Sequence, residues 1–448
     1  MKTRHIVSGL FGLLLAACAT GEKIGYSWEE DLHHRLLCDF TQSREQVLEY
    51  ITKYIPEVTD SQMAVWEAKK ELEYMVIDSQ KLYFRNAASN LFLINEECGA
   101  IRSKINGPQG ESNTTFACKN NIREIIPTVL AKSNKLDAYT APKRMRIIYT
   151  LTIKPDAVPE GELIRCWLPF PRKDIPRQQD VKLLATSEQE YQFSDPKCAH
   201  STIYMEKKAE AGKPTIFSES FEYTSLGAYF NLTEQDIQPY DTNSPLYKEY
   251  TAEREKHIVF TPRLRELADS LTAGLKTPLE KARALFRWVN DGFPWASARE
   301  YSTIENIPMY VLENKHGDCG QVTLLFVTLC RICGIPAHFQ SGFMMHPKAW
   351  NLHDWGEIYF EGVGWVPVDQ SFGIPTYAEN QREEWFYLGG IDSWRMIVNS
   401  DYGKELSPQK TYPRSETVDF QRGEVEWEGG NIYFDQWDYD MDIEYLDD

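Results

Sequence analysis

The feature that most constrains the fold is an apolar helix pattern followed at once by a paired-strand pattern, between residues 319 and 373. From Val322 to Cys330, apolar residues recur at the spacing of one helix face. Gly334 and Pro336 then end this helix, as a glycine after the last turn and a following proline do. A helix followed by paired strands within one domain predicts an α+β core.

The residues after this helix predict a β-hairpin, because two alternating segments between His353 and Asp369 flank a glycine-bearing turn. The loop length decides whether these two polar side chains share a face. A two-residue loop would put them on opposite faces of the sheet. A three-residue loop, residues 361–363, pairs Asp369 with Trp355 and places it diagonally across from His353. We therefore predict the three-residue loop or an equivalent bulge.

Other parts of the chain have different patterns. Residues before about 140 are rich in helix signals. The stretch 141–245 contains short runs of β-branched and aromatic residues with period two, separated by Pro, Gly and Asp clusters, which favours an immunoglobulin-like sandwich. From 401 onward aromatic residues alternate with acids, which fits either a disordered tail or a strand added late to a sheet.

These patterns predict six units. They are a signal peptide (1–17), a lipidated linker (18–27), a mainly helical region (28–140), a β-sandwich domain (141–245), a core domain holding the helix and the hairpin (246–400), and an acidic aromatic extension (401–448).

The first residues contain export signals. Lys2 and Arg4 precede an apolar run, residues 6–17, that is too short to span a bilayer and is typical of a signal peptide. Its end, Leu15-Ala16-Ala17-Cys18, resembles a bacterial lipobox, which implies cleavage before Cys18 and attachment of lipid to its thiol. An ordinary cleaved signal is the alternative. We therefore expect a chain that lipid anchors to the cell envelope, outside the cytoplasm.

The chain has nine cysteines, and an oxidising compartment would allow disulfides. Cys98 with Cys118, and Cys166 with Cys198, are plausible pairs, although the sequence alone does not fix connectivity. The single CxxC at 330–333 falls at the end of the predicted helix, so it fits neither a zinc site nor a thioredoxin-like motif well.

Cys319 lies at, or just before, the start of the predicted helix. There the unpaired backbone donors and the positive end of the macrodipole favour an anion, so we expect the pKa of its thiol to fall. Gly317 and Gly320 leave room for a substrate to approach. Alone, a free cysteine is more often a small buried hydrophobe. With His353 as a base and Asp369 as its orienting carboxylate, it predicts nucleophilic catalysis.

Two stretches, GDCGQVTLLFVTLCRICGIPAHFQSGF and LHDWGEIYFEGVGWVPVDQSF, resemble the transglutaminase-like core, a papain-type cysteine superfamily that is widespread in bacterial exported proteins. The likeness is strong over 317–373 and reaches back to about 262, and the preceding β region resembles the sandwich that often precedes that core. The resemblance implies a papain-like/transglutaminase-like α+β core with Cys319 as nucleophile, His353 as base and Asp369 as carboxylate. It also implies a thiolate–imidazolium pair, a thioester acyl-enzyme and an oxyanion hole that includes the backbone N–H of Cys319.

The resemblance leaves the rest of the oxyanion hole open. Animal transglutaminases use an upstream tryptophan there, and Trp288 and Trp295 are both available; Trp295, beyond the predicted helix, is freer to reach the site. Gln321 is a second candidate donor, although its place just inside the helix is equally consistent with a solvent-facing residue. No run spaces oxygen ligands as a calcium loop does, so we expect no metal and no cofactor.

Three functions remain open from the sequence: a cysteine hydrolase that releases an acyl group to water, a transamidase that passes it to an amine, and a binding module without turnover. The three candidate catalytic residues argue against the third, and the abundance of water outside the cell favours the first unless the site excludes it. A net charge of −18, from 66 acidic against 48 basic residues, disfavours nucleic acid as a partner. We expect a peptide or protein substrate, whose identity the sequence leaves open together with the oligomeric state.

Overall fold

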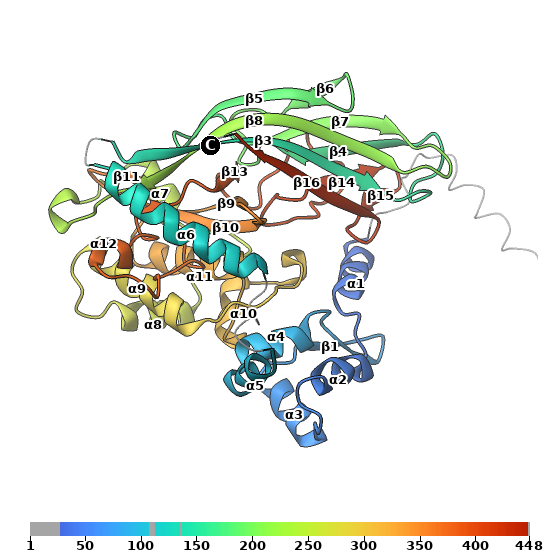
Figure 1. The fold of residues 1–448 in the computed structure, drawn as a ribbon, viewed down its shortest axis with the longest axis horizontal. Coiled ribbons are helices and arrows are strands. Elements are labelled where there is room, and N and C mark those ends of the chain that lie inside the picture. Colours follow the sequence, from blue (N-terminus) through green and yellow to red (C-terminus); the bar gives the residue numbers. More distant parts are fainter. Residues whose placement is uncertain (1–26, 107–112, 135–136, 447–448) are drawn as a thin grey trace, which may run out of the picture.

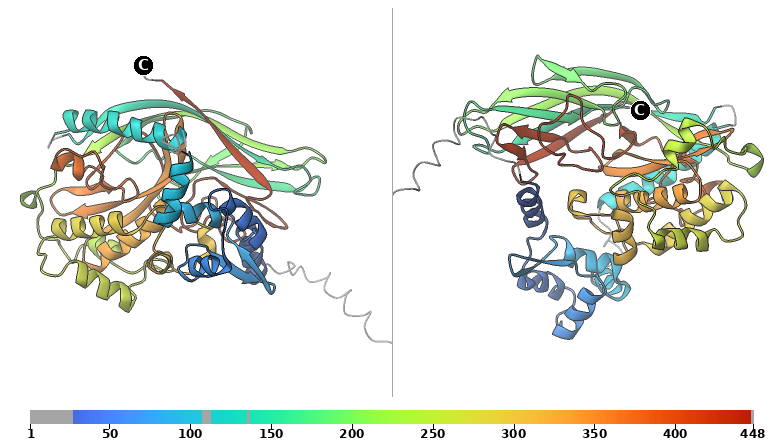
Figure 2. Two further views of the ribbon diagram at one scale, coloured as in Figure 1. Left: turned by 60° about the horizontal axis from the view of Figure 1, so that its bottom comes forward. Right: turned by 180° about the vertical axis from the view of Figure 1, so that it is seen from behind.

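A computed structural model describes residues 27–106, 113–134 and 137–446 of the chain. A β-sandwich forms the upper layer in Figure 1, a core of helices and one further sheet lies beneath it, and a small helical region sits to one side. The long helix α6 (Asn113–Lys132) runs along the core, between the sandwich and the helices below it (Figure 2).

The sandwich consists of two five-stranded antiparallel sheets. One has the order β12-β8-β3-β16 with β5 also paired to β8, and the other has the order β15-β14-β4-β7-β6. Every second side chain of β3 from Met145 to Ile153 is buried, as expected for a strand with one face on a core. The strands are β3 (Tyr139–Ile153), β4 (Leu163–Pro169), β5 (Gln178–Thr186), β6 (Tyr191–Phe193), β7 (Thr202–Lys208), β8 (Thr215–Tyr229), β12 (Gly390–Ile391), β14 (Glu424–Trp427), β15 (Gly430–Ile432) and β16 (Trp437–Tyr445).

The C-terminal residues complete both sheets of the sandwich. β16 pairs with β3 over its whole length, from Trp437 opposite Ile153 to Tyr445 opposite Met145. β14 pairs with β4 in the other sheet. Of the two alternatives for the acidic aromatic segment, the added strand is confirmed, because β16 pairs with β3 at the edge of a sheet.

The core domain places one buried helix against a four-stranded sheet of order β11-β10-β9-β13. This helix, α11 (Cys319–Ile332), is buried at every position from 320 to 331, so it is enclosed on all sides and not only along the stripe that its sequence displays. The other elements are α7 (Pro245–Tyr250), α8 (Pro262–Leu271), α9 (Pro278–Gly292), α10 (Ile307–Asn314), α12 (Gln381–Glu384), two short 3-10 turns (Glu234–Asp236 and Tyr301–Thr303), β9 (Ala337–His346), β10 (Ala349–Phe360), β11 (Gly364–Val368) and β13 (Arg395–Asn399).

The hairpin between β10 and β11 has the register that places His353 and Asp369 on the same face of the sheet. Gly356 pairs with Val368 and Phe360 with Gly364, which leaves 361–363 as a three-residue loop. Gly362 and Gly364 adopt φ values of 86° and 104°, which favour glycine. The predicted loop length is therefore confirmed.

The N-terminal region forms a small core of its own. It contains α1 (Trp28–Asp39), α2 (Arg44–Thr52), α3 (Asp60–Ala68), β1 (Tyr74–Ile77), β2 (Gln80–Tyr83), α4 (Ala87–Ile94) and α5 (Glu96–Asn106). Ser43 caps α2 through a capping box with Gln46, as its position predicts. Arg35 on α1 donates to the carbonyl oxygens of Arg414 and Ser415, which fixes this region to the segment before β14.

The two expected disulfides are absent, because every cysteine that the structure describes is a free thiol. Cys98 is buried in the N-terminal core, whereas Cys118 lies on α6. Cys166 is buried inside the sandwich, and Cys198 lies in a turn at its rim. Each proposed pair would therefore have to join thiols that the fold keeps in different environments.

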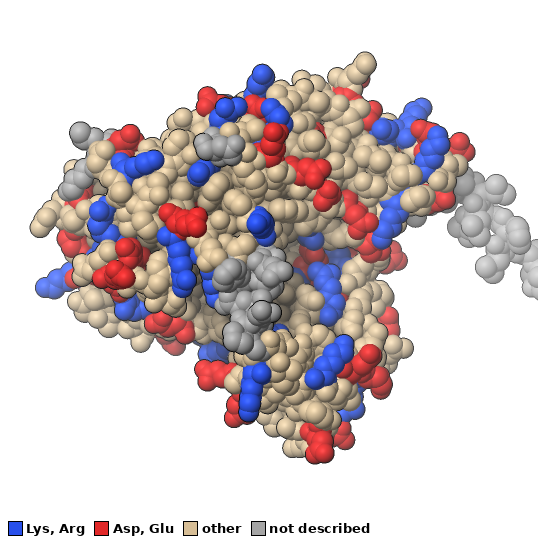
Figure 3. All heavy atoms as spheres, viewed as in Figure 1, with Lys and Arg blue, Asp and Glu red and all other residues tan. Residues whose placement is uncertain are grey.

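Basic and acidic side chains are interspersed over the face seen in Figure 3. Across the described parts of the chain, no helix combines the length and the hydropathy that crossing a bilayer requires. The expected signal peptide and Cys18 lie outside the described residues.

Candidate active site

Cys319 is the first residue of α11, at the position predicted for it. Asp318 is the N-cap: its carboxylate accepts from the backbone N–H of Gln321 at 3.0 Å, and the Gln321 side-chain oxygen accepts from the N–H of Asp318 at 3.2 Å. This reciprocal capping box stabilises the first turn and fixes the start of the helix. The Gln321 side chain is buried, so the solvent-facing alternative for this residue is wrong.

The segment before the cysteine is held by the chain around Trp295. Gly317 donates its N–H to the carbonyl of Pro294 and accepts from the N–H of Ala296. Trp295 itself is 50% exposed and lines the same cavity as Cys319. Gly320 has to be small, because a Cβ there would lie 2.3 Å from the Tyr301 hydroxyl oxygen.

His353 and Asp369 form a buried pair. The Nε2 atom of His353 lies 2.7 Å from Oδ2 of Asp369, and both side chains are almost fully buried. Arg395 on β13 contacts the same carboxylate oxygen at 3.0 Å. Burial alone would raise the pKa of Asp369, but His353 and Arg395 outweigh it and bring that pKa down to about 2. The carboxylate therefore stays ionised at neutral pH and holds the imidazole.

Further contacts fix this pair in place. The other carboxylate oxygen of Asp369 accepts from the backbone N–H groups of Ser371 and Phe372, at 3.1 and 3.0 Å. The Phe372 ring stacks on the His353 ring with 4.7 Å between centroids. Arg395 is balanced by a second carboxylate, that of Asp392, at 2.7 Å. The imidazole is thus oriented from its edge and from its face.

The sulfur of Cys319 hydrogen-bonds to the neighbour of His353. Its thiol donates to Oδ2 of Asp354 at 3.4 Å, and among the described residues no hydrogen bond joins it to the imidazole of His353. Adjacent strand residues point to opposite faces, and Asp354 shares the face of β10 on which Gly356 lies against Val327 of α11. The structure therefore joins His353 to Asp369 and Cys319 to Asp354. These are two separate pairs, each with one member on β10.

The two pairs are neighbours in sequence, because His353 and Asp354 are consecutive residues of β10. The pairing of β11 with β10 ends at Gly356, so the first turn of α11 reaches this edge of β10 beyond the end of β11. His353 is not among the residues that line the cavity beside Cys319, so in this structure the imidazole and the sulfur lie on different faces of β10.

The protonation of Cys319 differs from the sequence-based expectation. Burial, followed by the carboxyls of Asp354 and Asp318, raises the pKa of the thiol well above its ordinary value. The helix N-terminus acts in the opposite direction and does not compensate. Burial, Asp419 and Asp318 likewise raise the pKa of Asp354 well above the usual carboxyl range. The expected fall in the thiol pKa is therefore wrong for the ligand-free protein, because burial and the neighbouring carboxyls oppose ionisation of the thiol.

Cys319 opens into a cavity of about 230 Å³ whose walls are rich in acids. Asp354 accepts from the side-chain amide of Gln421 at 3.0 Å. Three arginines also line the cavity, and each is paired with a carboxylate: Arg422 with Glu300 at 2.9 Å, Arg85 with Asp39 at 3.2 Å and Arg299 with Glu73 at 3.5 Å. Within the described chain, Asp419 forms neither a hydrogen bond nor an ion pair through its carboxylate, and burial raises its pKa well above the usual range. The cavity is thus short of positive charge beside the sulfur.

A larger hollow of about 710 Å³ lies between α1 and α10, at Trp28, Lys256 and Met309. Its lining contains none of the predicted catalytic residues. Volume alone therefore does not select the site, whereas the thiol and the buried imidazole pair do.

Three polar residues of this site could not be found from the sequence pattern. Asp354 occupies a strand position whose side chain, by alternation, is expected to pack against the helix. Asp419 and Gln421 come from a segment far along the chain that has no helix or strand periodicity. The Asp318-x-x-Gln321 spacing was a readable capping signal.

Comparisons with known proteins bear on the same segment. Residues 265–370 match a family model described as the transglutaminase-like superfamily. A comparison with curated proteins finds no match.

Similar solved structures include a candidate cysteine protease from Cytophaga hutchinsonii, at 14% identity over 69% of this chain and 93% of that chain, with a TM-score of 0.48. The periplasmic domain of TgpA from Pseudomonas aeruginosa is 14% identical over 52% of this chain and 88% of that chain, with a TM-score of 0.27. A candidate protease from Parabacteroides distasonis is 10% identical over 66% of this chain and 45% of that chain, with a TM-score of 0.21. At these scores only the family match bears on the chemistry.

Proposed function

Because residues 265–370 form a transglutaminase-like superfamily domain, we propose that this protein is a cysteine hydrolase that cleaves amide or peptide bonds through Cys319, His353 and Asp369. One observation carries the proposal. Asp369 holds the buried His353 ring through Nε2 at 2.7 Å and so orients an imidazole base, next in sequence to Asp354, to which the Cys319 thiol donates.

The proposed reaction requires a rearrangement on substrate binding that brings the sulfur of Cys319 from Asp354 to the imidazole of His353. His353 takes the thiol proton, and the sulfur attacks the carbonyl carbon of the amide. His353 then returns that proton to the departing amine, which leaves a thioester on Cys319. Water, deprotonated by the same imidazole, attacks the thioester carbon, and the acid and the free thiol are released. Asp369 stays ionised throughout and stabilises the imidazolium.

The developing oxyanion needs donors beside Cys319. The backbone N–H of Cys319 has no partner within α11, because it belongs to the first helical residue. Trp295 lines the same cavity, and the buried side-chain nitrogen of Gln321 has no acceptor in the described part of the structure. We propose the Cys319 N–H with one of these two side chains as the oxyanion hole.

The charge of the cavity favours a substrate with an ammonium group near the scissile carbonyl. Asp354 and Asp419 face the same space as the sulfur, and Asp419 has no cation of its own within the described chain. The cavity is smaller than the pockets of about 300–1,000 Å³ that enclose drug-sized ligands. It therefore suits one amino terminus or one basic side chain better than an extended peptide.

The first test asks which residue is the base. Cleavage of a peptide amide at neutral pH is expected to be lost in His353→Ala and kept in Asp354→Asn, because only the first change removes the proposed base. Cys333→Ala, which removes a free thiol at the other end of α11, is the matched control and should cleave normally. A loss of cleavage in Asp354→Asn with none in His353→Ala would overturn the assignment of His353.

The second test concerns turnover and charge. Cleavage of peptide amides should require Cys319, and acetylation of a free amino terminus should lower kcat/KM by at least about tenfold, a loss of about 1.4 kcal/mol. Asp419→Asn should shrink this difference, whereas the exposed control Asp174→Asn should keep it. Equal cleavage of both peptides by the wild-type protein would refute the preference for an amine. It would not affect the assignment of Cys319 as the nucleophile.

The same acidic cavity also favours a second function. An acid-lined space beside a thioester can hold an acceptor amine, which would make the protein a transamidase. Incubation with a peptide amide and a labelled primary amine separates the two. Release of free acid alone supports hydrolysis, and stable incorporation of the amine supports transfer.

We also propose that lipid on Cys18 holds the protein at the outer side of a membrane. The support is the sequence of the first residues, in which a short apolar run ends at Leu15-Ala16-Ala17-Cys18. Labelled fatty acid should enter the protein when it is made in a bacterial host and should not enter Cys18→Ala. Equal labelling of both would exclude this anchor.

A further inference from the structure

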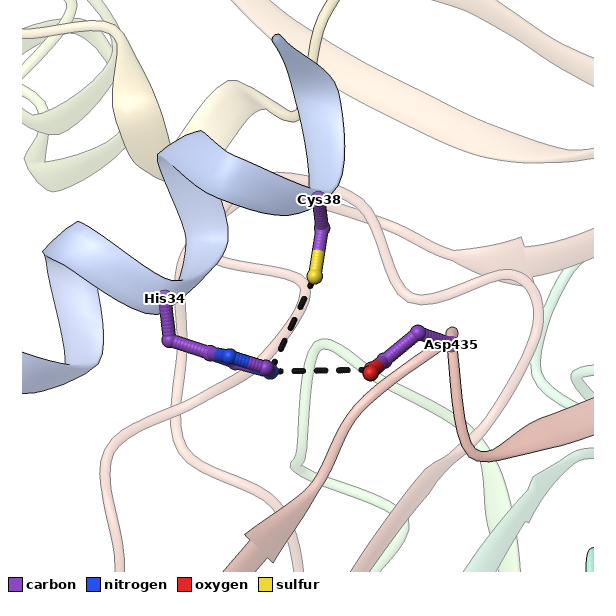
Figure 4. Close-up of side chains that lie close together, drawn as sticks. All are labelled: His34, Cys38 and Asp435. Atoms are coloured by element: carbon purple, nitrogen blue, oxygen red, sulfur yellow. Dashed lines mark hydrogen bonds and ion pairs between the residues drawn. The ribbon is translucent and has the colours of Figure 1, made fainter. Parts of the chain in front are cut away.

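Three side chains from the two ends of the described chain meet at the surface beneath the sandwich. His34 and Cys38 lie four residues apart on α1 and therefore project from one helix face, and Asp435 lies in the turn that leads into β16 (Figure 4). The ring Nε2 of His34 lies 3.7 Å from the sulfur of Cys38 and 3.6 Å from a carboxylate oxygen of Asp435. All three donor atoms lie within 4.8 Å of one another.

We propose that His34, Cys38 and Asp435 form a binding site for a divalent transition metal ion, with Zn²⁺ as the best match. A tetrahedral Zn²⁺ with bonds of about 2.0–2.1 Å to N and O and about 2.3 Å to S keeps N and S about 3.6 Å apart, and N and O about 3.4 Å apart. The two separations in the protein are only about 0.1–0.2 Å longer than these values. Imidazole, thiolate and carboxylate are the three donor types that zinc sites use.

The electrostatics of the site also match a cation. Asp435 belongs to the site and Asp39 follows Cys38 directly in sequence, so two carboxylates lie close to the imidazole and the thiol. Metal binding would break the S–H bond and form an S–Zn bond, and the proton would leave to solvent, with no change of oxidation state.

The proposed metal site would leave one coordination position open to solvent and would link two parts of the fold. Three protein ligands leave the fourth tetrahedral position to water, and His34 and Asp435 are each 45% exposed, so an ion can enter. The bound ion would join α1 to the turn before β16. Asp39, next to the site on α1, accepts from the backbone N–H of Glu300, which lines the Cys319 cavity, so the ion would also hold one wall of that cavity in position.

The test uses the purified full chain carrying Cys319→Ala, so that the candidate catalytic thiol contributes no metal binding. After treatment with a chelator, the protein is dialysed against Zn²⁺ alone, and bound zinc is counted by mass spectrometry. One ion per chain is expected. His34→Ala, Cys38→Ser and Asp435→Asn should each weaken binding at least about tenfold, or 1.4 kcal/mol. His33→Ala, on the same helix and paired with Asp78, is the matched control and should bind normally.

Two further measurements keep the proposal testable if a variant folds poorly. With Co²⁺ in place of Zn²⁺, the parent protein should show a thiolate-to-metal charge-transfer absorption that Cys38→Ser lacks. Zn²⁺ should also slow amide hydrogen exchange across 28–39 in the parent and not in Asp435→Asn, a change in an exposed turn. Absence of stoichiometric zinc, or equal binding by the three variants and the parent, would overturn the site.

Discussion

Replacing Asp369 by Asn tests the buried charge arrangement around His353 most directly. The pKa of Asp369 is about 2 against an ordinary value of 3.8. This lowering of the pKa corresponds to roughly 2 kcal/mol of stabilisation of the folded protein by the ionised carboxylate. Asn also leaves Arg395 and His353 with one counter-ion fewer in a fully buried place, so the loss of unfolding free energy should fall between about 2 and 5 kcal/mol.

Urea unfolding of both proteins between pH 7 and pH 2 measures this loss. A carboxyl whose pKa is lowered by folding contributes stability above its unfolded value, near 3.8, and loses it as the pH falls through its folded value, near 2. The free-energy gap between wild type and Asp369→Asn should therefore be constant from pH 7 to about pH 5 and close as the pH falls below about 4. Other acids titrate in the same range, but they are common to both proteins.

The exposed ion pair of Asp174 with Arg172 supplies the control. Asp174 is 52% exposed, so Asp174→Asn should cost less than about 1 kcal/mol. A gap between wild type and Asp369→Asn that is as small as this, or that does not change with pH, would refute the buried pair. If His353 also acts as the proposed base, kcat should fall far more than KM rises, because the imidazole loses its orientation.

Three other changes have definite expected outcomes. Labelling of Cys319 by iodoacetamide, followed by mass spectrometry, should rise steeply with pH in the alkaline range, because burial and Asp354 raise the thiol pKa; a flat profile would contradict this. Gly320→Ala should lower the urea midpoint by the equivalent of about 1–3 kcal/mol, since its Cβ would clash with the Tyr301 hydroxyl, and an unchanged midpoint would exclude the clash. Truncation before 437–445 should abolish the cooperative calorimetric transition, because β3 loses its edge partner; a preserved transition would show that this strand is dispensable.

The parts of the fold that sequence patterns predicted are those set by neighbouring residues. The limits of α11 follow from Asp318, Gly334 and the apolar spacing between them, and the 361–363 loop follows from the requirement that two polar strand ends share a face. Both are local rules of period and capping. The addition of β16 to a sheet was predictable only as one of two alternatives, because alternation identifies a strand but not its partner.

The thiol pKa was not predictable because it depends on contacts distant in sequence. A helix N-terminus contributes roughly 0.3–1 kcal/mol to an anion. A carboxylate at 3.4 Å from a thiolate, when both are ionised, opposes it by about 5 kcal/mol at an effective dielectric constant of 20. Burial and then the carboxyl of Asp354 therefore outweigh the helix N-terminus and raise the thiol pKa, and no periodicity in the sequence indicates either. The cluster of His34, Cys38 and Asp435 was not predictable for the same reason, since Asp435 is almost the whole chain away from Cys38 in sequence.

The pairing of β3 with β16 restricts when the protein can fold. β3 is made long before β16, so this sheet of the sandwich keeps an unfilled edge until the residues of β16 have been added. Contacts of such long sequence separation form slowly, since a large loop has to close before they stabilise anything. A chain that ends before β16 therefore cannot complete this sheet, and the sandwich reaches its final pairing only after β16 is made.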